Sequence, residues 1–421
     1  MGSVRAMAST RLLCLFNNRV ADSTKTLARA GWSLSCRRNV SSSPSRLQSC
    51  MPGWVIDQYG TNGVLTYTED IPVPTVNSPS DVMIKVYAAS LNPLDIAMRG
   101  GYGATLLKLK RHPMSVLGSD YGSEFPLILG RDVSGVVVDC GSEVTHVAPG
   151  DEFPVETRQS GRICDSNRVS HKPKSVTHAE AASIPYVANT ALSALVNAGV
   201  LITGGSGGVG TFSIQLLKAW GAHVTVTCSQ NAEGLVRGLG ADEVVDYTAG
   251  DAPEQLEMME KFDVVLDNVG GETEQLALGL LKPWSGAKYV TLVTPLLLNT
   301  DSMGLLDGIC QAGSSLQSKA IQNIISGGVF YRWGFYAPDG PALDDVSRLV
   351  DAGKILPVVE AQFPFTQVPQ AFQKLEQGHA RGKTVVRVTE EDYQQAEELV
   401  QESCSDTAEF EQERREPAEQ H

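Results

Sequence analysis

The sequence lacks long hydrophobic runs and paired cysteines. No stretch of about 18 or more apolar residues occurs, so no transmembrane helix is expected. The eight cysteines are scattered over 421 residues, and none belongs to a C-x-x-C pair. This spacing argues against a disulfide framework and against a cysteine-rich zinc cluster. The sequence also contains no convincing Ser-His-Asp or paired-carboxylate site.

Both ends of the chain differ in composition from its centre. Residues 1–50 contain seven arginines, one lysine and many serines against one acid, Asp22, which is the composition of a mitochondrial transit peptide. We therefore expect import into the mitochondrial matrix and cleavage near Met51; a basic leader without an address is the alternative. Residues 389–421 contain twelve acids against two arginines, and we expect a disordered tail or a solvated helix there. This acidity argues against nucleic acid as a partner, because phosphates would be repelled.

The pattern between these ends predicts two domains, as expected for this length. Residues 51–185 contain short strands separated by Gly, Pro and Asn, and VMIKVY alternates apolar with polar residues. In residues 186–340 helical stretches alternate with short apolar strands, which is typical of a doubly wound parallel sheet. Residues 341–388 contain two helices and the strand KTVVRV, and we predict that they return to the β-rich domain. The fold class is therefore α/β, with a nucleotide-binding domain inserted into a discontinuous β-rich domain.

A glycine-rich loop opens the second domain. Gly205, Gly207 and Gly210 have the spacing G-x-G-x-x-G between a short strand and the apolar-periodic helix TFSIQLLKAWGA. Glycines permit a tight turn and a close approach of a pyrophosphate, and the helix N-terminus supplies free N–H groups. The sequence therefore predicts a dinucleotide site, and a glycine-rich turn without a cofactor is the alternative.

The end of the following strand indicates which dinucleotide binds. NAD-binding proteins place Asp or Glu there, about 20 residues after the glycines, to hold the ribose 2′-hydroxyl. Here residues 226–230 read VTCSQ and contain no acid. A carboxylate would repel a 2′-phosphate, whereas the hydroxyl of Ser229 can donate to it, and Arg237 and Tyr247 are near in sequence. NADPH is therefore predicted over NADH; an ordinary loop serine is the alternative.

These segments resemble the medium-chain dehydrogenase/reductase superfamily, in its zinc-free quinone oxidoreductase branch. The resemblance covers most of residues 51–388 and is carried by AASLNPLDIAMRGGYG, FPLILGRDVSGVVVDCGSEVTHVAPGDEF, AASIPYVANTAL, GGSGGVG, GADEVVDY and GKTVV. It implies a GroES-like β-rich catalytic domain and a Rossmann domain that binds NADPH.

The resemblance also implies catalysis without a metal. Zinc-dependent members have a Cys ligand where Asn92 stands, and a Gly-His-Glu triplet where Gly130, Arg131 and Asp132 stand. Catalytic zinc needs three protein ligands, which Asp132 alone does not supply. Without a Lewis acid to polarise the substrate, a quinone or an activated enone that accepts hydride readily is the implied acceptor.

The resemblance assigns residues to the cofactor and to the substrate. The cofactor positions lie in the glycine loop, near the adenosine phosphate, at two strand ends and on the far wall of the cleft: Ser206, Gly207, Gly208, Val209, Ser229, Tyr247, Asn268, Leu292, Tyr331, His379, Ala380 and Arg381. Asn92 and Asp95 are predicted to shape the substrate side, with a structural role in a turn as the alternative. No residue is assigned to catalysis or to a metal.

Three functions are consistent with the resemblance. The first is an NADPH-dependent quinone or enone reductase, linked to ubiquinone biosynthesis. The second is a trans-enoyl reductase, and the third is a cofactor-binding regulatory protein with a reticulon-type membrane protein as its partner. A monomer or a homodimer is expected. Two stretches depart from the family. Residues 153–170 are polar without a strand pattern, and the link before the first strand of the nucleotide-binding domain, around residues 197–201, is short.

Overall fold

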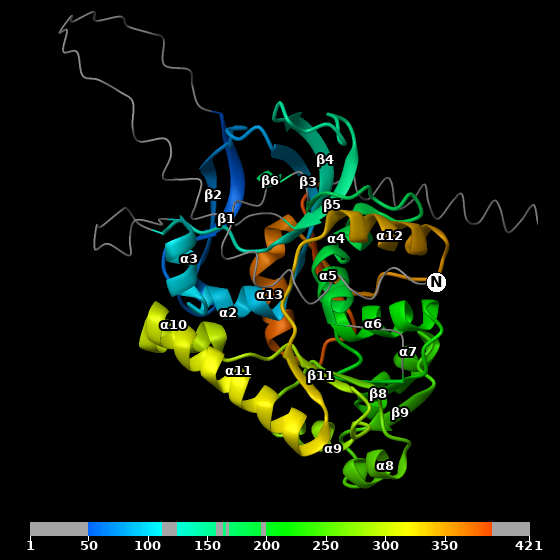
Figure 1. Cartoon of the computed structure of the whole chain (residues 1–421). Helices are drawn as coiled ribbons and strands as arrows, with labels where there is room; N and C mark the ends of the chain where they lie inside the picture. Colours follow the sequence, from blue (N-terminus) through cyan, green and yellow to red (C-terminus); the bar gives the residue numbers. More distant parts are fainter. Residues whose placement is uncertain (1–48, 112–123, 157–162, 166–167, 195–198, 390–421) are drawn as a thin grey trace, which may run out of the picture. The chain divides into compact units, whose positions relative to one another are not determined.

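The computed structural model describes residues 49–111, 124–156, 163–165, 168–194 and 199–389. These residues belong to one compact unit that starts at Ser49. Residues 1–48 of the predicted leader, 390–421 of the predicted acidic tail and 197–198 of the short link lie outside the described residues. Within the unit, two six-stranded sheets carry most of the structure, and helices surround them (Figure 1).

The β-rich part contains the first sheet and a separate hairpin. The hairpin pairs β1 (Cys50–Ile56) with β2 (Leu65–Pro72). The sheet has the order β13-β14-β3-β4-β5, with β6 also paired to β3. Its strands are β3 (Asp81–Leu91), β4 (Asp132–Cys140), β5 (Glu152–Glu156), β6 (Ile163–Asp165), β13 (Val359–Pro364) and β14 (Lys383–Arg387). Because β14 pairs with β3, residues 383–387 belong to the sheet of the β-rich part.

Two of these strands occur where the sequence pattern indicated none. Strand β5 pairs with β4, and β6 pairs with β3. Phe153 and Val155 in β5 are fully buried, so an apolar alternation exists there but covers only two positions. The prediction of a stretch without strands was therefore wrong for both segments, while residues 157–162 lie outside the described part of the chain.

The second sheet is parallel throughout and has the order β12-β11-β10-β7-β8-β9. Strand β7 lies between β10 and β8, so the order reverses there, which makes it the topological switch point of the sheet. The central strands are short apolar runs because helices bury both faces of the sheet. The strands are β7 (Val200–Thr203), β8 (Val224–Cys228), β9 (Glu243–Asp246), β10 (Val264–Asp267), β11 (Lys288–Thr291) and β12 (Phe330–Trp333).

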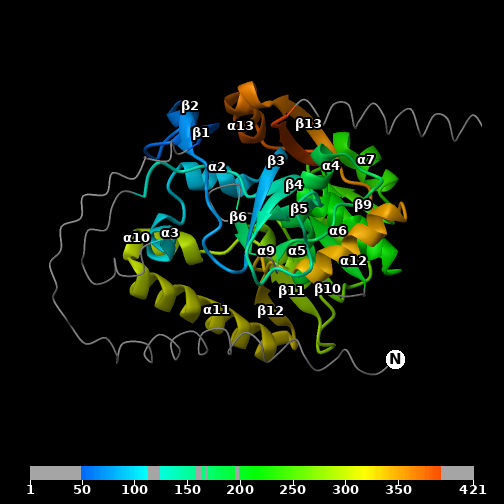
Figure 2. The same cartoon turned by 90° about the horizontal axis from the view of Figure 1, so that it is seen from above.

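Helices pack on both faces of this sheet (Figure 2). The helices on one face are α5 (Pro185–Ala194), α6 (Gly208–Ala219), α7 (Glu233–Gly238) and α12 (Gly340–Asp351). Those on the other face are α8 (Ala252–Met258), α9 (Thr273–Gly279) and α11 (Leu305–Gly327). Helix α12 corrects the predicted division, because its apolar residues Leu343, Val346 and Val350 join the core of the parallel sheet and not that of the β-rich part.

The remaining helices connect or cover these sheets. They are α2 (Pro93–Arg99), α3 (Ala104–Arg111), α4 (His178–Ala182), α10 (Leu296–Met303) and α13 (Val368–Glu376), with the 3₁₀ turns η1 (Asn62–Val64), η4 (Gln230–Ala232) and η5 (Phe365–Gln367). The backbone N–H groups of Gly103, just before α3, and of Thr105, in its first turn, donate to the carboxylate of Asp301 in α10. In the described part of the chain, no helix combines the length and the hydrophobicity that a bilayer crossing requires.

Candidate functional site

Two adjoining cavities lie at the carboxyl ends of the central parallel strands. The wide cavity has a volume of about 660 Å³ and includes Thr203 and Thr227 at the ends of β7 and β8. The narrow cavity has a volume of about 280 Å³ and includes Asn268 and Leu292, just after β10 and β11. Both are lined by Gly204, Gly207 and Ala380, so they form one continuous cleft. Ligands of open α/β sheets bind at this place, beside the switch point.

The three glycines of the loop have different surroundings. A Cβ at Gly205 would lie 1.9 Å from Cγ1 of Val226, and one at Gly210 would lie 2.6 Å from backbone atoms of Gly204 and Gly205. Neither position has room for a side chain. A Cβ at Gly207 would meet nothing nearer than 3.8 Å, so this position faces open space. Gly207 is the N-cap of α6 and lines both cavities, where the first N–H groups of the helix have no intrahelical partner.

The loop before β14 forms the opposite wall. Gly382 makes an isolated parallel bridge with Gly207, which places residues 379–382 against the glycine loop. His379 adopts φ of 51°, a left-handed conformation that costs a non-glycine residue about 1–2 kcal/mol. Its Nδ1 lies 3.4 Å from the hydroxyl of Tyr247, and both residues line the wide cavity.

Ser229 lines the wide cavity and directly follows β8. Its hydroxyl donates to Oδ1 of Asn231 at 2.8 Å. The neighbouring Arg237 does not line the cavity and pairs with Glu233 at 2.7 Å. Among the described residues that line this cavity, Glu272 is the only carboxylate. The end of the strand therefore presents a hydroxyl where NAD-binding proteins present an acid.

The wall of the narrow cavity offers an unused acceptor at Asn268. Its Nδ2 donates to the backbone oxygen of Thr203 at 2.9 Å, which fixes the side chain at the end of β7. Its Oδ1 is buried and has no hydrogen-bond partner among the described residues. A buried acceptor without a partner costs about 1–3 kcal/mol, so a ligand with an N–H donor is the natural complement. Together with the open space at Gly207, this acceptor shows that the cleft fits a dinucleotide.

A buried polar network closes the narrow cavity on the side of the β-rich part. Nζ of Lys383 donates to Oδ1 of Asn92 at 2.5 Å and to Oδ2 of Asp132 at 3.3 Å. Asp132 also accepts from Nδ2 of Asn92, the hydroxyl of Ser90 and the backbone N–H of Tyr186. Asn92, Tyr186 and Lys383 line the cavity. The sequence reasoning missed Lys383, although a lysine directly before the β-branched run TVV was a usable signal.

Three of the predicted site residues do not line either cavity. Asp95 caps α2, where its Oδ2 accepts from the backbone N–H of Asn92 at 2.8 Å, so it has the structural role given as the alternative. Tyr331 lies in the core of the parallel sheet, where its hydroxyl donates to Glu274. Arg381 is exposed, and its backbone N–H donates to Glu360. The other predicted residues line the cleft: Asn92, Ser206, Gly207, Gly208, Val209, Ser229, Tyr247, Asn268, Leu292, His379 and Ala380.

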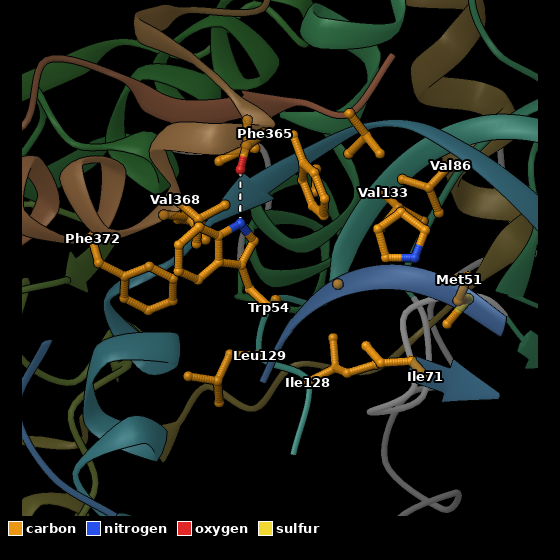
Figure 3. A pocket seen from close by; sticks show the side chains of 17 residues that line it. Met51, Trp54, Ile71, Val86, Ile128, Leu129, Val133, Phe365, Val368 and Phe372 are labelled. Atoms are coloured by element: carbon orange, nitrogen blue, oxygen red, sulfur yellow. Dashed lines mark hydrogen bonds between the residues drawn. The ribbon is translucent and has the colours of Figure 1, made fainter. Parts of the chain in front are cut away.

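A third cavity, the apolar cavity, lies inside the β-rich part (Figure 3). Its volume is about 110 Å³, and its lining comes from β1, β2, β3, β4, η5, α13 and β14 and from the segment 128–130 before β4. Among the side chains labelled in Figure 3, that of Trp54 carries a polar N–H group, which donates to the backbone oxygen of Phe365 at 2.8 Å. Among the described residues that line this cavity, none has a charged side chain to bind a phosphate, so the cleft remains the candidate site for a nucleotide.

Sequence families match both parts of the fold. Residues 78–190 match the alcohol dehydrogenase GroES-like domain, and residues 239–386 match the zinc-binding dehydrogenase family. The chain is 56% identical to a *Danio rerio* protein, NAD(P)H oxidoreductase RTN4IP1, mitochondrial, over 85% of this chain and 97% of that protein. The protein belongs to the medium-chain dehydrogenase/reductase superfamily. The predicted combination of a GroES-like domain with a Rossmann domain is therefore confirmed.

More distant relatives agree with this membership. A *Caenorhabditis elegans* relative, Reticulon-4-interacting protein 1, mitochondrial, is 35% identical over 82% of this chain and 96% of that protein. An *Arabidopsis thaliana* relative, NADPH-dependent alkenal/one oxidoreductase, chloroplastic, is 31% identical over 80% of this chain and 79% of that protein. The structure of the quinone oxidoreductase from *Coxiella burnetii* superposes with a TM-score of 0.63 at 26% identity, over 81% of this chain and all of that one.

These comparisons confirm the coarser predictions. The chain is an oxidoreductase with a nicotinamide cofactor. It is mitochondrial, as several close relatives are. The choice of NADPH, the identity of the acceptor, the absence of zinc and the assignment of individual residues stay predictions.

Proposed function

We propose that this protein is an NADPH-dependent reductase of the mitochondrial matrix that delivers hydride to a quinone or an activated enone without zinc. The observation that carries the proposal is the continuous cleft. Gly207, an open position, lines both of its cavities; the wide cavity includes Ser229, and the narrow cavity includes Asn92 and Lys383. We assign the adenosine half of the cofactor to the wide cavity, and the reacting half with the acceptor to the narrow cavity.

The hydroxyl of Ser229 supports NADPH as the cofactor. Ser229 lies in the lining of the wide cavity, and its present partner Asn231 is an exposed neighbour that a phosphate can replace. No carboxylate stands at the end of β8 to hold a 2′-hydroxyl or to repel a 2′-phosphate. The phosphate–hydroxyl contact is a charge-assisted hydrogen bond, which is about twice as strong as a neutral one.

The donor set beside the narrow cavity supports chemistry without a metal. Asn92 and Asp132 stand at the positions that the family resemblance aligns with zinc ligands, and both are hydrogen-bonded to Lys383. In the described residues, no group of three His, Cys, Asp or Glu side chains could hold a metal ion. The bound nicotinamide supplies the hydride, while the chain's own residues position the acceptor and exclude water.

The names of two relatives support the acceptor class: one is a quinone oxidoreductase and the other an alkenal/one oxidoreductase. Quinones and alkenals or alkenones are all conjugated carbonyl compounds, which accept hydride without a Lewis acid. We extend the proposal to the ubiquinone pathway, since a quinone acceptor in mitochondria suggests it. A trans-enoyl reductase fits the same cleft, and activity on enoyl thioesters distinguishes it.

The second candidate function is not enzymatic: a regulatory protein that binds the cofactor and a protein partner. A relative that is named as a reticulon-interacting protein supports a membrane-protein partner. Binding of cofactor without turnover is the result that this candidate predicts. We propose a monomer or a homodimer for either role.

We also propose a domain division. Residues 1–50 are the leader, residues 51–185 with 341–388 the GroES-like domain, residues 186–340 the Rossmann domain and residues 389–421 the acidic tail. Helix α12 packs on the Rossmann domain.

A substrate screen tests the proposal. NADPH absorbance is followed with a benzoquinone, an enone and an enoyl thioester, before and after exhaustive chelation. We expect turnover with the first two that chelation leaves unchanged. The control is Gly208→Asp, which places a charge where the pyrophosphate is expected. A Cβ added at this position would lie 2.7 Å from Cδ of Lys383. Turnover that is lost on chelation and restored by zinc would contradict the zinc-free reading, and turnover by the control would contradict the assigned cleft.

A further inference from the structure

We propose that the ammonium group of Lys383 binds the oxygen of the acceptor and gives it the proton that completes the reduction. This inference rests on the proposed function and assigns a catalytic residue to it. Lys383 is the only charged residue among the described residues that line the narrow cavity. It is 5% exposed, so its charge is held next to the cavity and away from bulk water.

The hydrogen bonds of Lys383 leave one of its protons available. An ammonium group has three N–H donors. One donates to Asn92 and a second to Asp132, and the third has no acceptor among the described residues. Asn92 lines the cavity and Asp132 does not. The carboxylate therefore balances the positive charge from behind, while the amide of Asn92 keeps Nζ at the edge of the cavity.

The stem of Lys383 gives the amine a fixed position. A Cβ at Gly208 would lie 2.7 Å from Cδ and 3.3 Å from Cγ of Lys383, so the stem lies directly against the glycine loop. The side chain starts on β14 in the β-rich sheet and reaches the network beside α2. A residue held at both ends in this way is preorganised, so little reorganisation accompanies the reaction.

A cation at this place favours the chemistry, although a conjugated acceptor does not require a metal. Hydride addition to a quinone or an enone brings two electrons and one hydrogen to the acceptor, and leaves a negative charge on its oxygen. Nζ–H of Lys383 donates to that oxygen and then transfers its proton, which forms the O–H bond and leaves a neutral amine. With a quinone this step gives the hydroquinone. With an enone it gives the enol, which tautomerises to the saturated ketone by taking a proton from water at the α-carbon and returning the O–H proton to water. The amine takes a proton from water. The ammonium thus supplies the positive charge that zinc supplies in metal-dependent enzymes.

A bound phenol tests this role without turnover. 4-Nitrophenol is titrated into the protein with oxidised dinucleotide over a range of pH, and its absorbance separates phenol from phenolate. The phenolate oxygen represents the anionic oxygen of the reduced acceptor. We expect the wild type to bind the phenolate about 10- to 100-fold more tightly than Lys383→Met does, as for one charge-assisted hydrogen bond. Binding of the neutral phenol is expected to change little.

Two further variants make the test specific. Lys282→Met removes an exposed lysine that pairs with Asp263 at 2.9 Å, and it is expected to behave as the wild type. The double variant Lys383→Met/Asp132→Asn is used if Lys383→Met does not fold, because it leaves no unpaired buried carboxylate. It is also expected to lose the preference for phenolate. An unchanged preference in folded Lys383 variants would overturn the inference even if the wild type reduces quinones. Absence of turnover in the wild type would instead overturn the proposed function.

Discussion

The two glycines at positions 207 and 210 separate the folding role of the loop from its binding role. Alanine at Gly210 places its Cβ 2.6 Å from backbone atoms of Gly204 and Gly205, closer than real Cβ contacts come. The turn must open to relieve this contact, and such overpacking costs about 1–3 kcal/mol. Alanine at Gly207 meets nothing nearer than 3.8 Å, so its effect on stability is that of an N-cap exchange, within about 1 kcal/mol.

The effects on cofactor binding distinguish Gly207 from Gly210. The methyl group of Gly207→Ala enters the space that both cavities share, where a pyrophosphate would approach the N-terminus of α6. Loss of one charge-assisted hydrogen bond from a backbone N–H weakens dinucleotide binding roughly 10- to 100-fold.

Urea unfolding and calorimetric titration with NADPH measure stability and binding separately. We expect Gly207→Ala to keep its stability and lose affinity, and Gly210→Ala to lose stability. A Gly207→Ala protein that binds as tightly as the wild type would refute the assignment of the cleft.

Three further predictions concern cofactor choice, pH and maturation. Ser229→Asp is expected to weaken NADPH binding by about 1–3 kcal/mol through repulsion of the 2′-phosphate, and equal or tighter binding of NADH by the wild type contradicts the reasoning. Burial raises the pKa of Asp95 to about 6, so the unfolding free energy falls by about 3 kcal/mol as pH rises from about 4 to above 6. Asp95→Asn is expected to lose this dependence of the unfolding free energy on pH. If urea unfolding gives the wild type and Asp95→Asn the same pH dependence, the prediction is wrong. N-terminal sequencing of protein from mitochondria is expected to begin near Met51, and a mature form that starts at Met1 rules cleavage out.

The glycine loop could be predicted from the sequence because its signal is local. Strand, G-x-G-x-x-G and apolar helix follow one another within residues 200–219, and the backbone alone decides their geometry. The positions of Ser229 and Asn268 follow from the same logic, since strand ends of a parallel sheet meet at one edge. Both residues line the cleft.

What the sequence could not supply depends on contacts between distant segments. The apolar stripe of α12 predicts a buried face, but periodicity does not say which core receives it. Strand β12 is four residues long and carries Tyr331, whose side chain packs into the core and not into the cleft. Lys383 meets Asn92 only because β14 pairs with β3, a pairing between opposite ends of the unit.

Transfer of deuterium is the most direct test of the central claim that this cleft delivers hydride from NADPH to a conjugated acceptor. The protein is given NADPH deuterated at the transferable C4 position together with an enone, and the product is examined by mass spectrometry and NMR. We predict one deuterium per molecule, on the carbon β to the carbonyl, because the hydride passes directly between rings held about 3–3.5 Å apart. A reduced product without deuterium, or bound NADPH that is never oxidised, would contradict the account.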